Sequence, residues 1–374
     1  LNTGIYAYAK AGFGNFIGFS SAWGYWISAF IGTISYFVLL GSTIGQFFAP
    51  FGAGNTPAAI AFSSALLWAL HWMVLRGIRQ AAILNIITTA GKVVPLLLFV
   101  ILAVFAFKFD IFTADFWGAA TPALGRPLDQ VKAMMMVTVW VFIGIEGAST
   151  ISARAQRRSD IGRSTVLAFF TVLALLVSVN VLSMGILSQA ELSRLQEPSL
   201  AYVLQAAVGP WGAWLVRFGL MISVLGAMLA WTLLCPEILY VPAKEGEMPR
   251  FLARATPDGV PSATLLVTNL AVQLFLLLTL FSTSAYHNLV NLASSAVLPP
   301  YLFSALYCLM VAARDPGYAS SSERLREIII SLVAVGYALW LLYASGLDHL
   351  MLSALLYAPG ALLFIKARRE KGER

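Results

Sequence analysis

Long apolar segments alternate with short polar segments along the whole chain. A hydrocarbon core of about 30 Å is crossed by about 20 helical residues, and on that scale the apolar segments predict about ten membrane-spanning helices. The first and sixth exceed the required length, so we expect them to tilt or to extend beyond the membrane. The expected spans are residues 16–48, 58–75, 82–107, 133–153, 164–188, 205–241, 262–282, 289–312, 327–345 and 348–365.

The lysines and arginines are distributed unevenly between the two alternating sets of loops. Of the 24 in the chain, 18 lie on the side that includes both ends of the chain, and four lie on the other side. Because positively charged loops stay in the cytoplasm, this asymmetry predicts that both termini are cytoplasmic. The 18 are Lys10, Arg76, Arg79, Arg154, Arg157, Arg158, Arg163, Lys244, Arg250, Arg254, Arg314, Arg324, Arg326, Lys366, Arg368, Arg369, Lys371 and Arg374; the four are Lys108, Arg126, Lys132 and Arg194.

Composition agrees with a chain surrounded by lipid. Hydrophobic residues make up 59% of the sequence and charged residues 11%, and the mean hydropathy is +0.81. Soluble domains carry about 25% charged residues. The composition therefore predicts an all-α, multi-pass membrane protein. The net charge of +7 follows from the loop asymmetry, so it does not indicate a nucleic-acid partner.

The residues that carry catalytic or metal chemistry are few and scattered. Cys235 and Cys308 both lie in apolar segments and indicate no disulfide framework. The histidines, His71, His287 and His349, have no metal-ligand spacing. The sequence contains no Walker loop, no GxSxG motif and no haem-attachment motif. We therefore expect no cofactor and no metal, and a membrane enzyme is the least favoured class.

One stretch, residues 137–152 (VTVWVFIGIEGASTIS), is unusual for a membrane helix. It places Glu146 between Gly144 and Gly147 in an apolar span. An acidic residue at mid-bilayer costs about 2.5–3.5 kcal/mol, and such residues usually mark a transport pathway. A helix break in a transporter exposes amides and carbonyls that can bind an anion and an ammonium respectively. The stretch therefore predicts a break at residues 142–147 that binds a solute carrying both charges.

Three further ionisable residues fall within the expected spans. Lys92 and Glu237 lie deep, where they mark a pathway or form a buried pair that can include Glu146. Arg217 lies near the end of its span, and its long side chain can reach the interface. Trp231 lies in mid-span, where membrane anchoring does not explain it, and its aromatic face is suited to a cation.

Several stretches resemble the basic amino acid antiporters of the amino acid–polyamine–organocation superfamily. The most specific are GIYAYAKAGFG (4–14) and WVFIGIEGAS (140–149), and the resemblance covers nearly the whole chain. It implies an inverted repeat of five plus five helices followed by two more, with the first and sixth helices broken at the substrate. It also implies that this chain starts at the third family helix and lacks the first two. Residues 1–107 would then be the remainder of the first repeat (family helices three to five), and residues 108–312 the second repeat (family helices six to ten). Residues 313–374 would be the two last helices and a basic cytoplasmic tail.

The same resemblance implies where the substrate binds. Trp140 takes the place of an aromatic gate over the substrate. Phe142, Ile143 and Gly144 would present backbone to the α-amino group, and Trp231 would pack on the substrate side chain.

The resemblance also implies residues for gating and coupling. Tyr25 matches a gating tyrosine, Glu146 matches an acidic residue of proton sensing or coupling, and Lys92 matches a lysine that replaces sodium in some relatives. Glu237 remains a candidate for coupling because of its depth. Thr33 departs from the family pattern, which has Asn at this substrate-binding position in carriers of basic amino acids.

The function implied by the resemblance is exchange of cationic amino acids across the bacterial inner membrane by alternating access, arginine for ornithine with lysine as a further substrate. A proton-coupled importer of basic amino acids or polyamines on the same fold is the nearest alternative. A truncated fragment or a non-transporting membrane subunit is the alternative from another class. The expected partners are these amino acids and the bilayer, and a homodimer is left open.

Overall fold

The computed structural model describes residues 4–77, 81–118, 125–146, 158–314 and 321–372. Its regular elements there are α-helices and short 3-10 helices, which confirms the all-α fold. Eight of the described helices are long and apolar enough to cross a membrane. The elements are α1 (Ile5–Phe13), α2 (Asn15–Gly45), η1 (Ala49–Phe51), α3 (Pro57–Leu75), α4 (Ala81–Ala106), α5 (Phe109–Thr113), α6 (Pro127–Phe142), α8 (Arg158–Met184), α9 (Gln189–Leu192), α10 (Ser199–Val208), α11 (Pro210–Lys244), η4 (Arg250–Ala253), α12 (Ser262–Leu278), η5 (Thr279–Phe281), α13 (Ala285–Arg314) and α14 (Ser321–Lys371).

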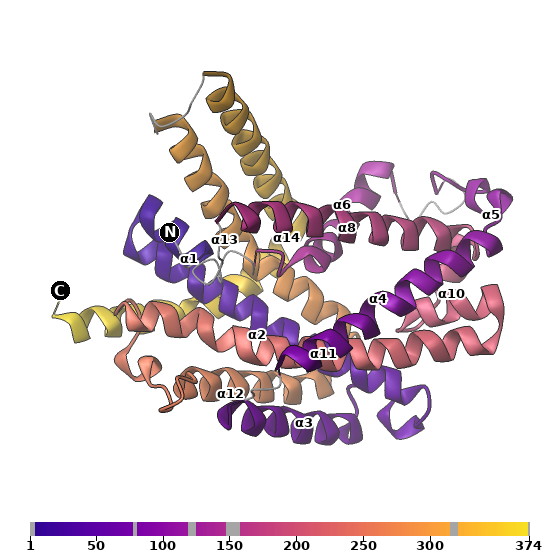
Figure 1. Cartoon of the computed structure of the whole chain (residues 1–374), viewed down its shortest axis with the longest axis horizontal. Coiled ribbons are helices and arrows are strands. Elements are labelled where there is room, and N and C mark those ends of the chain that lie inside the picture. Colours follow the sequence, from indigo (N-terminus) through magenta and orange to yellow (C-terminus); the bar gives the residue numbers. More distant parts are fainter. Residues whose placement is uncertain (1–3, 78–80, 119–124, 147–157, 315–320, 373–374) are drawn as a thin grey trace.

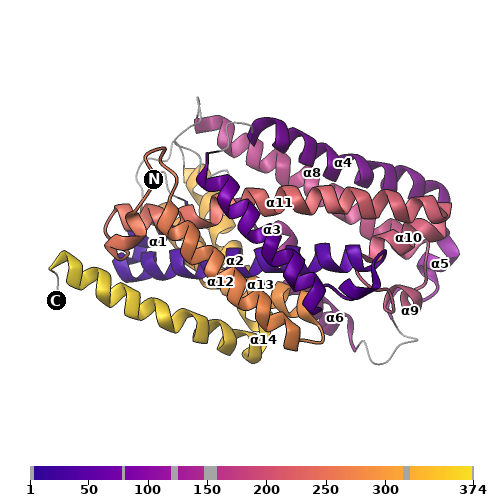
Figure 2. The ribbon, with the colours of Figure 1, turned by 90° about the horizontal axis from the view of Figure 1, so that it is seen from below.

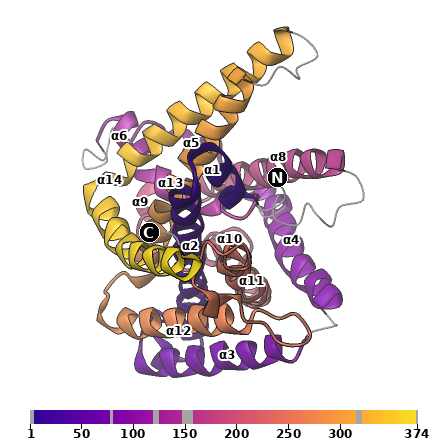
Figure 3. The same cartoon turned by 90° about the vertical axis from the view of Figure 1, so that its left-hand side faces the viewer.

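Helix α2 is the centre of the molecule. Of its most apolar stretch of 18 residues, 83% is buried, and it packs against α13, α11 and α1. Figure 3 shows α2 in the middle with α11, α13 and α14 around it. Glycines allow close approach along this helix: a Cβ at Gly24 would overlap the Tyr357 hydroxyl, and one at Gly32 would lie 2.8 Å from the Trp140 ring.

Helix α8 has the opposite environment. None of the most apolar stretch of 18 residues in α8 is buried. Figure 2 shows α4 and α8 side by side along one edge of the bundle, next to α11. Lipid is as apolar as the side chains of this helix, so its outward surface needs no protein partner. The outer helices therefore enclose α2 on one side and face the bilayer on the other.

Helices α3 and α12 lie side by side below α2 in Figure 1 and are joined by polar side chains. The indole of Trp68 donates to Gln273 at 3.1 Å, and the Gln273 amide donates to Ser64 at 2.9 Å. One turn further on, His71 and Asn269 are hydrogen bonded at 2.8 Å. Such bonds satisfy polar groups inside the membrane and fix the pairing of the two helices.

Glycines interrupt the chain at two places among the expected spans. The spans expected at 327–345 and 348–365 are the two helical segments of α14, which meet at a kink at Gly346, where φ is +77°. The span expected at 133–153 stops early: α6 ends at Phe142, Gly144 has a φ of +105°, and residues 147–157 lie outside the described part. Both interruptions occur at glycines whose backbone conformation most other residues avoid.

The sixth expected span is also divided. α10 ends at Val208, Gly209 has a φ of +90°, and Pro210 opens α11. Proline is favoured in the first turn of a helix because its missing N–H would have no partner there. The short α10 and the long α11 are therefore separate elements, and α11 alone is long enough to cross the membrane.

Candidate functional site

A cavity of about 1330 Å³ lies between α2, the end of α6 and α11. Pockets for small ligands are typically about 300–1,000 Å³, so this one has room for a solute and water. Six of the residues singled out in the sequence line it: Tyr25, Lys92, Ile143, Gly144, Trp231 and Glu237. The structure thus brings together residues from helices α2, α4, α6 and α11 that are up to 212 positions apart in the sequence.

The end of α6 forms one wall of the cavity. The helix stops at Phe142, Ile143 is extended, and Gly144 has a φ of +105°, a region that disfavours residues with a Cβ. The Ile143 amide still donates to the Val139 carbonyl at 3.1 Å, so the last turn is closed before the chain leaves the helix. The break lies where the sequence predicts it, although Gly147 is outside the described residues.

Glu146 folds back onto this break. Its Oε2 accepts a hydrogen bond from the Gly144 amide at 3.0 Å, and its Oε1 accepts one from the Tyr301 hydroxyl at 3.0 Å. Tyr25 of α2 also interacts with this carboxylate. Glu146 therefore connects α6 to α13 and α2 directly beside the cavity.

Tyr301 was not among the residues that the sequence indicated. It lies in a run of apolar residues after Pro299 and Pro300, which reads as an ordinary span. It reaches Glu146 from 155 positions away, and only the folded packing of α13 against α6 reveals the pair. A tyrosine hydroxyl that is buried in a membrane protein needs a polar partner. A tyrosine within an apolar span is therefore the sequence signal that could have indicated a contact with a polar residue such as Glu146.

Two tryptophans stand on either side of the break. Trp231 lines the cavity, and its Cζ2 lies 3.4 Å from the position that a Cβ on Gly144 would occupy. Trp140 stacks at an angle on Tyr36, with ring centroids 5.7 Å apart, and covers Gly32. Tyr36 lines the cavity and Trp140 does not, so Trp140 supports a residue of the cavity wall.

Three other residues that the sequence singled out have side chains that do not line the cavity. The Thr33 hydroxyl donates to the carbonyl of Ala29 in its own helix at 2.9 Å, so it does not offer the side-chain contact that the resemblance implies. Phe142, which is expected to offer only its backbone, packs its ring on Phe169 of α8, with ring centroids 5.3 Å apart. Arg217, which is expected to reach the interface, lies at the far end of α11 with its guanidinium 5.6 Å from the ring centroids of both Phe47 and Tyr202.

The arrangement is suited to binding a solute that has a cationic end and an apolar stem. Aromatic faces and backbone groups meet at one wall of a cavity that also includes Lys92 and Glu237, and the Glu146 carboxylate is hydrogen bonded to Gly144 of that wall. The described residues contain no group of three or more His, Cys, Asp or Glu that could hold a metal ion. Binding without chemical conversion is what these residues provide.

The chain is similar to known proteins along most or all of its length. Residues 1–364 match the family model described as amino acid permease. The chain is 55% identical over its whole length to the arginine/ornithine antiporter of Pseudomonas aeruginosa, of which the match covers 79%. It is 40% identical over its whole length to an L-lysine transport protein of Corynebacterium glutamicum, covering 78% of it. It is 41% identical to an arginine/agmatine antiporter of Chlamydia trachomatis, again over the whole chain and 78% of that relative.

Proposed function

This chain belongs to the amino acid permease family, and from that premise we propose that it exchanges arginine for ornithine across the bacterial inner membrane by alternating access. It is a multi-pass bacterial membrane protein and a permease, not an enzyme. The observation that carries the proposal is the break in α6, where Glu146 and Trp231 flank Gly144 at the wall of the cavity. The names of the relatives, which include arginine, ornithine, agmatine and lysine, support a cationic substrate.

The geometry supports distinct roles for the residues of the site. The backbone leaves the helical pattern after Phe142, at Ile143 and Gly144, and in our proposal the carbonyls of these three residues face an α-amino group. The face of Trp231 offers a surface to a guanidinium or ammonium, an interaction worth about 0.5–2 kcal/mol. Glu146, held by Tyr301 and Gly144, supplies the negative charge beside it.

Exchange follows from the charge of the two substrates. Arginine and ornithine both carry a single positive charge, so swapping them does no work against the membrane potential, whereas unpaired movement of one charge involves about 2.3 kcal/mol per 100 mV. In our proposal the two repeats expected from the sequence, residues 1–107 and 108–312, move relative to each other around the bound substrate. Lys92 and Glu237 are proposed to take part in coupling because both line the cavity.

Transport by the purified chain in liposomes tests the proposal. We expect labelled arginine to enter rapidly when ornithine is inside and slowly when the interior contains buffer alone. Equal entry under both conditions would contradict exchange. Entry that instead follows an imposed pH gradient would identify the proton-coupled importer, and no specific binding or entry of arginine would identify a non-transporting chain.

We also propose that both termini lie in the cytoplasm, because the loops on that side hold most of the positive charge. The test uses Arg369→Cys, at an exposed position near the end of α14, in a chain with Cys235→Ser and Cys308→Ser. A thiol reagent that does not cross membranes should label it in inverted vesicles and not in intact cells. Light scattering in detergent measures the mass of the protein in its micelle and shows whether the chain is a homodimer.

A further inference from the structure

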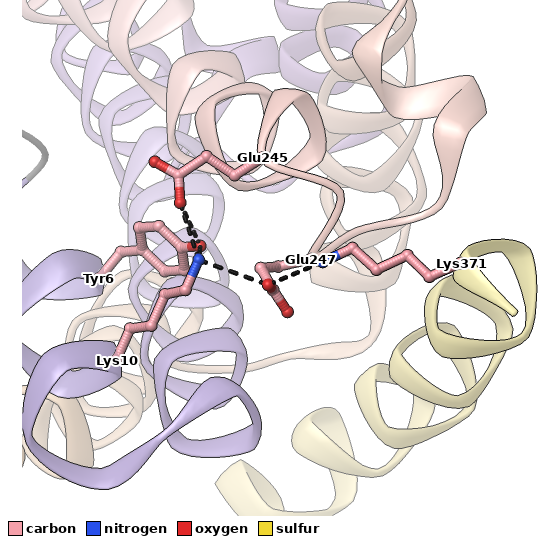
Figure 4. A network of polar contacts seen from close by, with 5 residues as sticks. All are labelled: Tyr6, Lys10, Glu245, Glu247 and Lys371. Atoms are coloured by element: carbon pink, nitrogen blue, oxygen red, sulfur yellow. Dashed lines mark hydrogen bonds and ion pairs between the residues drawn. The ribbon is translucent and has the colours of Figure 1, made fainter. Parts of the chain in front are cut away.

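A network of five charged or polar side chains joins three distant parts of the chain at the face of the molecule where α1 and the end of α14 lie (Figure 4). We call it the terminal-face network; it consists of Tyr6, Lys10, Glu245, Glu247 and Lys371. Tyr6 and Lys10 belong to α1, the two glutamates follow the end of α11, and Lys371 ends α14. Of these residues Tyr6 also lines the cavity, and the other four are not among its lining residues.

Glu247 is the centre of the network. Its side chain is 3% exposed, and its Oε1 lies 2.9 Å from the Lys371 ammonium and 3.3 Å from the Lys10 ammonium. Its amide donates to the Pro242 carbonyl at 2.9 Å, which turns the chain inward directly after α11. A buried carboxylate is unstable unless it is paired, so both lysines are required to keep it there.

Lys10 connects this centre to a second carboxylate. Its ammonium lies 2.9 Å from Glu245 Oε2, which also accepts a hydrogen bond from the Tyr6 hydroxyl at 2.9 Å. Burial opposes the ionisation of Glu247, but Lys371 and Lys10 outweigh this and lower the pKa of Glu247 below its ordinary value. The carboxylate is therefore charged at neutral pH and holds both lysines.

The end of α14 is attached to the same segment a second time. The Glu370 carboxylate accepts a hydrogen bond from the Arg250 amide at 2.7 Å, and the Glu370 carbonyl accepts one from the Arg250 guanidinium at 2.9 Å. The Lys366 ammonium lies over the Phe251 ring, 5.3 Å from its centroid. Isolated surface ion pairs contribute little to stability. Here, however, Glu370 and Lys371, which are adjacent in α14, contact Arg250 and Glu247 at the two ends of segment 247–250.

The network also borders the cavity. Tyr6 lines the cavity, and so do Val241 and Pro242 at the end of α11, just before the two glutamates. Any movement of α1 relative to the end of α11 therefore changes this rim. We propose that Glu247 is a positioning residue for transport: by binding Lys10 and Lys371 through one buried oxygen, it ties the C-terminal helix to the α1 rim of the cavity. This inference rests on the proposed function, because the cavity is taken as the transport path.

The first test measures whether α14 holds α1, independently of transport. Glu247→Gln removes the central charge, and Lys371→Met removes only the contact from the end of α14, where a loss of folding is not expected. Arg369→Met, which removes a charge from an exposed position on the same turn, is the matched control. Coupling between two sites typically changes an equilibrium about fivefold or more. We therefore expect amide hydrogen exchange in residues 5–13 to be at least about fivefold faster in Lys371→Met than in Arg369→Met.

The second test measures the sidedness of the effect. Half-saturation by arginine is measured from outside with intact cells and from inside with inverted vesicles, for the same three variants. In inverted vesicles, we expect Lys371→Met and Glu247→Gln to shift the arginine concentration for half-saturation by about fivefold or more. In intact cells, we expect that concentration to stay unchanged. A merely structural weakening would lower the amount of active protein and leave both values as they were.

The outcomes separate this inference from the proposed function. Unchanged hydrogen exchange in α1, or an equal shift of half-saturation at both faces, would overturn the role of Glu247. If the wild-type chain exchanged no arginine for ornithine, the proposed function would fail, and faster exchange in α1 on loss of Lys371 would still establish the tie itself. If Glu247→Gln did not fold, Lys371→Met would decide the question alone.

Discussion

Two carboxylates organise this protein, and they are held in opposite ways. Glu146 accepts hydrogen bonds from the Gly144 amide and the Tyr301 hydroxyl, which are neutral donors. Glu247 accepts from two ammonium groups, those of Lys10 and Lys371. Both carboxylates follow the end of a helix and both join distant elements, so among these contacts the difference lies in the charge of the partners.

The comparison indicates that the charge of its partners suits one carboxylate to binding a substrate and the other to connecting helices. Neutral donors orient a carboxylate without adding an opposite charge, which suits a group that meets a cationic substrate. Ammonium groups neutralise the carboxylate and connect the elements that carry them, which suits a structural tie. The predictions that follow test this separation, beginning with the largest expected effect.

Glu146→Gln should damage transport most. The amide cannot accept both hydrogen bonds that the carboxylate accepts, and it carries no charge for the substrate. Each hydrogen bond to a charged group contributes about 1.5–3 kcal/mol, so we expect arginine exchange to fall about a hundredfold. Exchange is measured in liposomes with ornithine inside. Glu191→Gln, at an exposed carboxylate that caps α9, is the control and should exchange like wild type; similar loss in both variants would contradict the role of Glu146.

Trp231→Leu should weaken substrate binding more than folding. Leucine is compatible with lipid and packs well, but it offers no aromatic face to a cation. The lost interaction is worth about 0.5–2 kcal/mol, so the affinity for arginine should fall about three- to thirtyfold. Trp72→Leu is the control, because Trp72 is 59% exposed on α3. Unchanged affinity together with collapsed expression would show that Trp231 only packs.

Tyr301→Phe should have a smaller effect. The ring stays in place and only the hydroxyl that donates to Glu146 is lost. This is a single hydrogen bond to a charged group, and at the lower end of the range for such bonds, about 1.5 kcal/mol, we expect the exchange rate to fall about tenfold. Tyr343→Phe, at an exposed position on α14, should leave the rate unchanged. A loss as large as that of Glu146→Gln would mean that Tyr301 has a role beyond holding this carboxylate.

The terminal-face network should be insensitive to mild acidification. Because the pKa of Glu247 is lowered in the folded protein, its stabilisation is complete above the ordinary carboxyl range and is lost only as pH falls through the lowered value. With an ordinary value of about 4.3 for glutamate, α1 should be equally protected from hydrogen exchange at neutral pH and one unit above that value. The measurement is corrected for the intrinsic pH dependence of exchange. Loss of protection over that interval would contradict the pairing, and Lys371→Met provides the unprotected reference.

The sequence could predict the helices and the break in α6, because hydrophobic length and glycine act locally. It could not predict that Tyr301 reaches Glu146, since the two are 155 positions apart and Tyr301 stands in an ordinary apolar run. It indicated the Thr33 side chain by family position, whereas the Thr33 hydroxyl donates to a carbonyl within α2. From the sequence, Lys10 and Lys371 indicate only that their loops are cytoplasmic. Their neighbours in the sequence do not indicate that both bind the buried Glu247.

The close packing around α2 has a consequence for how this chain can vary. At Gly24 and Gly32 even one added methyl group would collide with Tyr357 or Trp140, whereas none of the most apolar stretch of 18 residues in α8 is buried. Substitution tolerance should therefore be distributed very unevenly between these two apolar helices. A saturation library should accept almost any apolar residue along α8 and little beyond the original residue at these two glycines of α2. The inner helix is thus where divergence between related carriers would be slowest, and the outer helix is where tags and labels are best introduced.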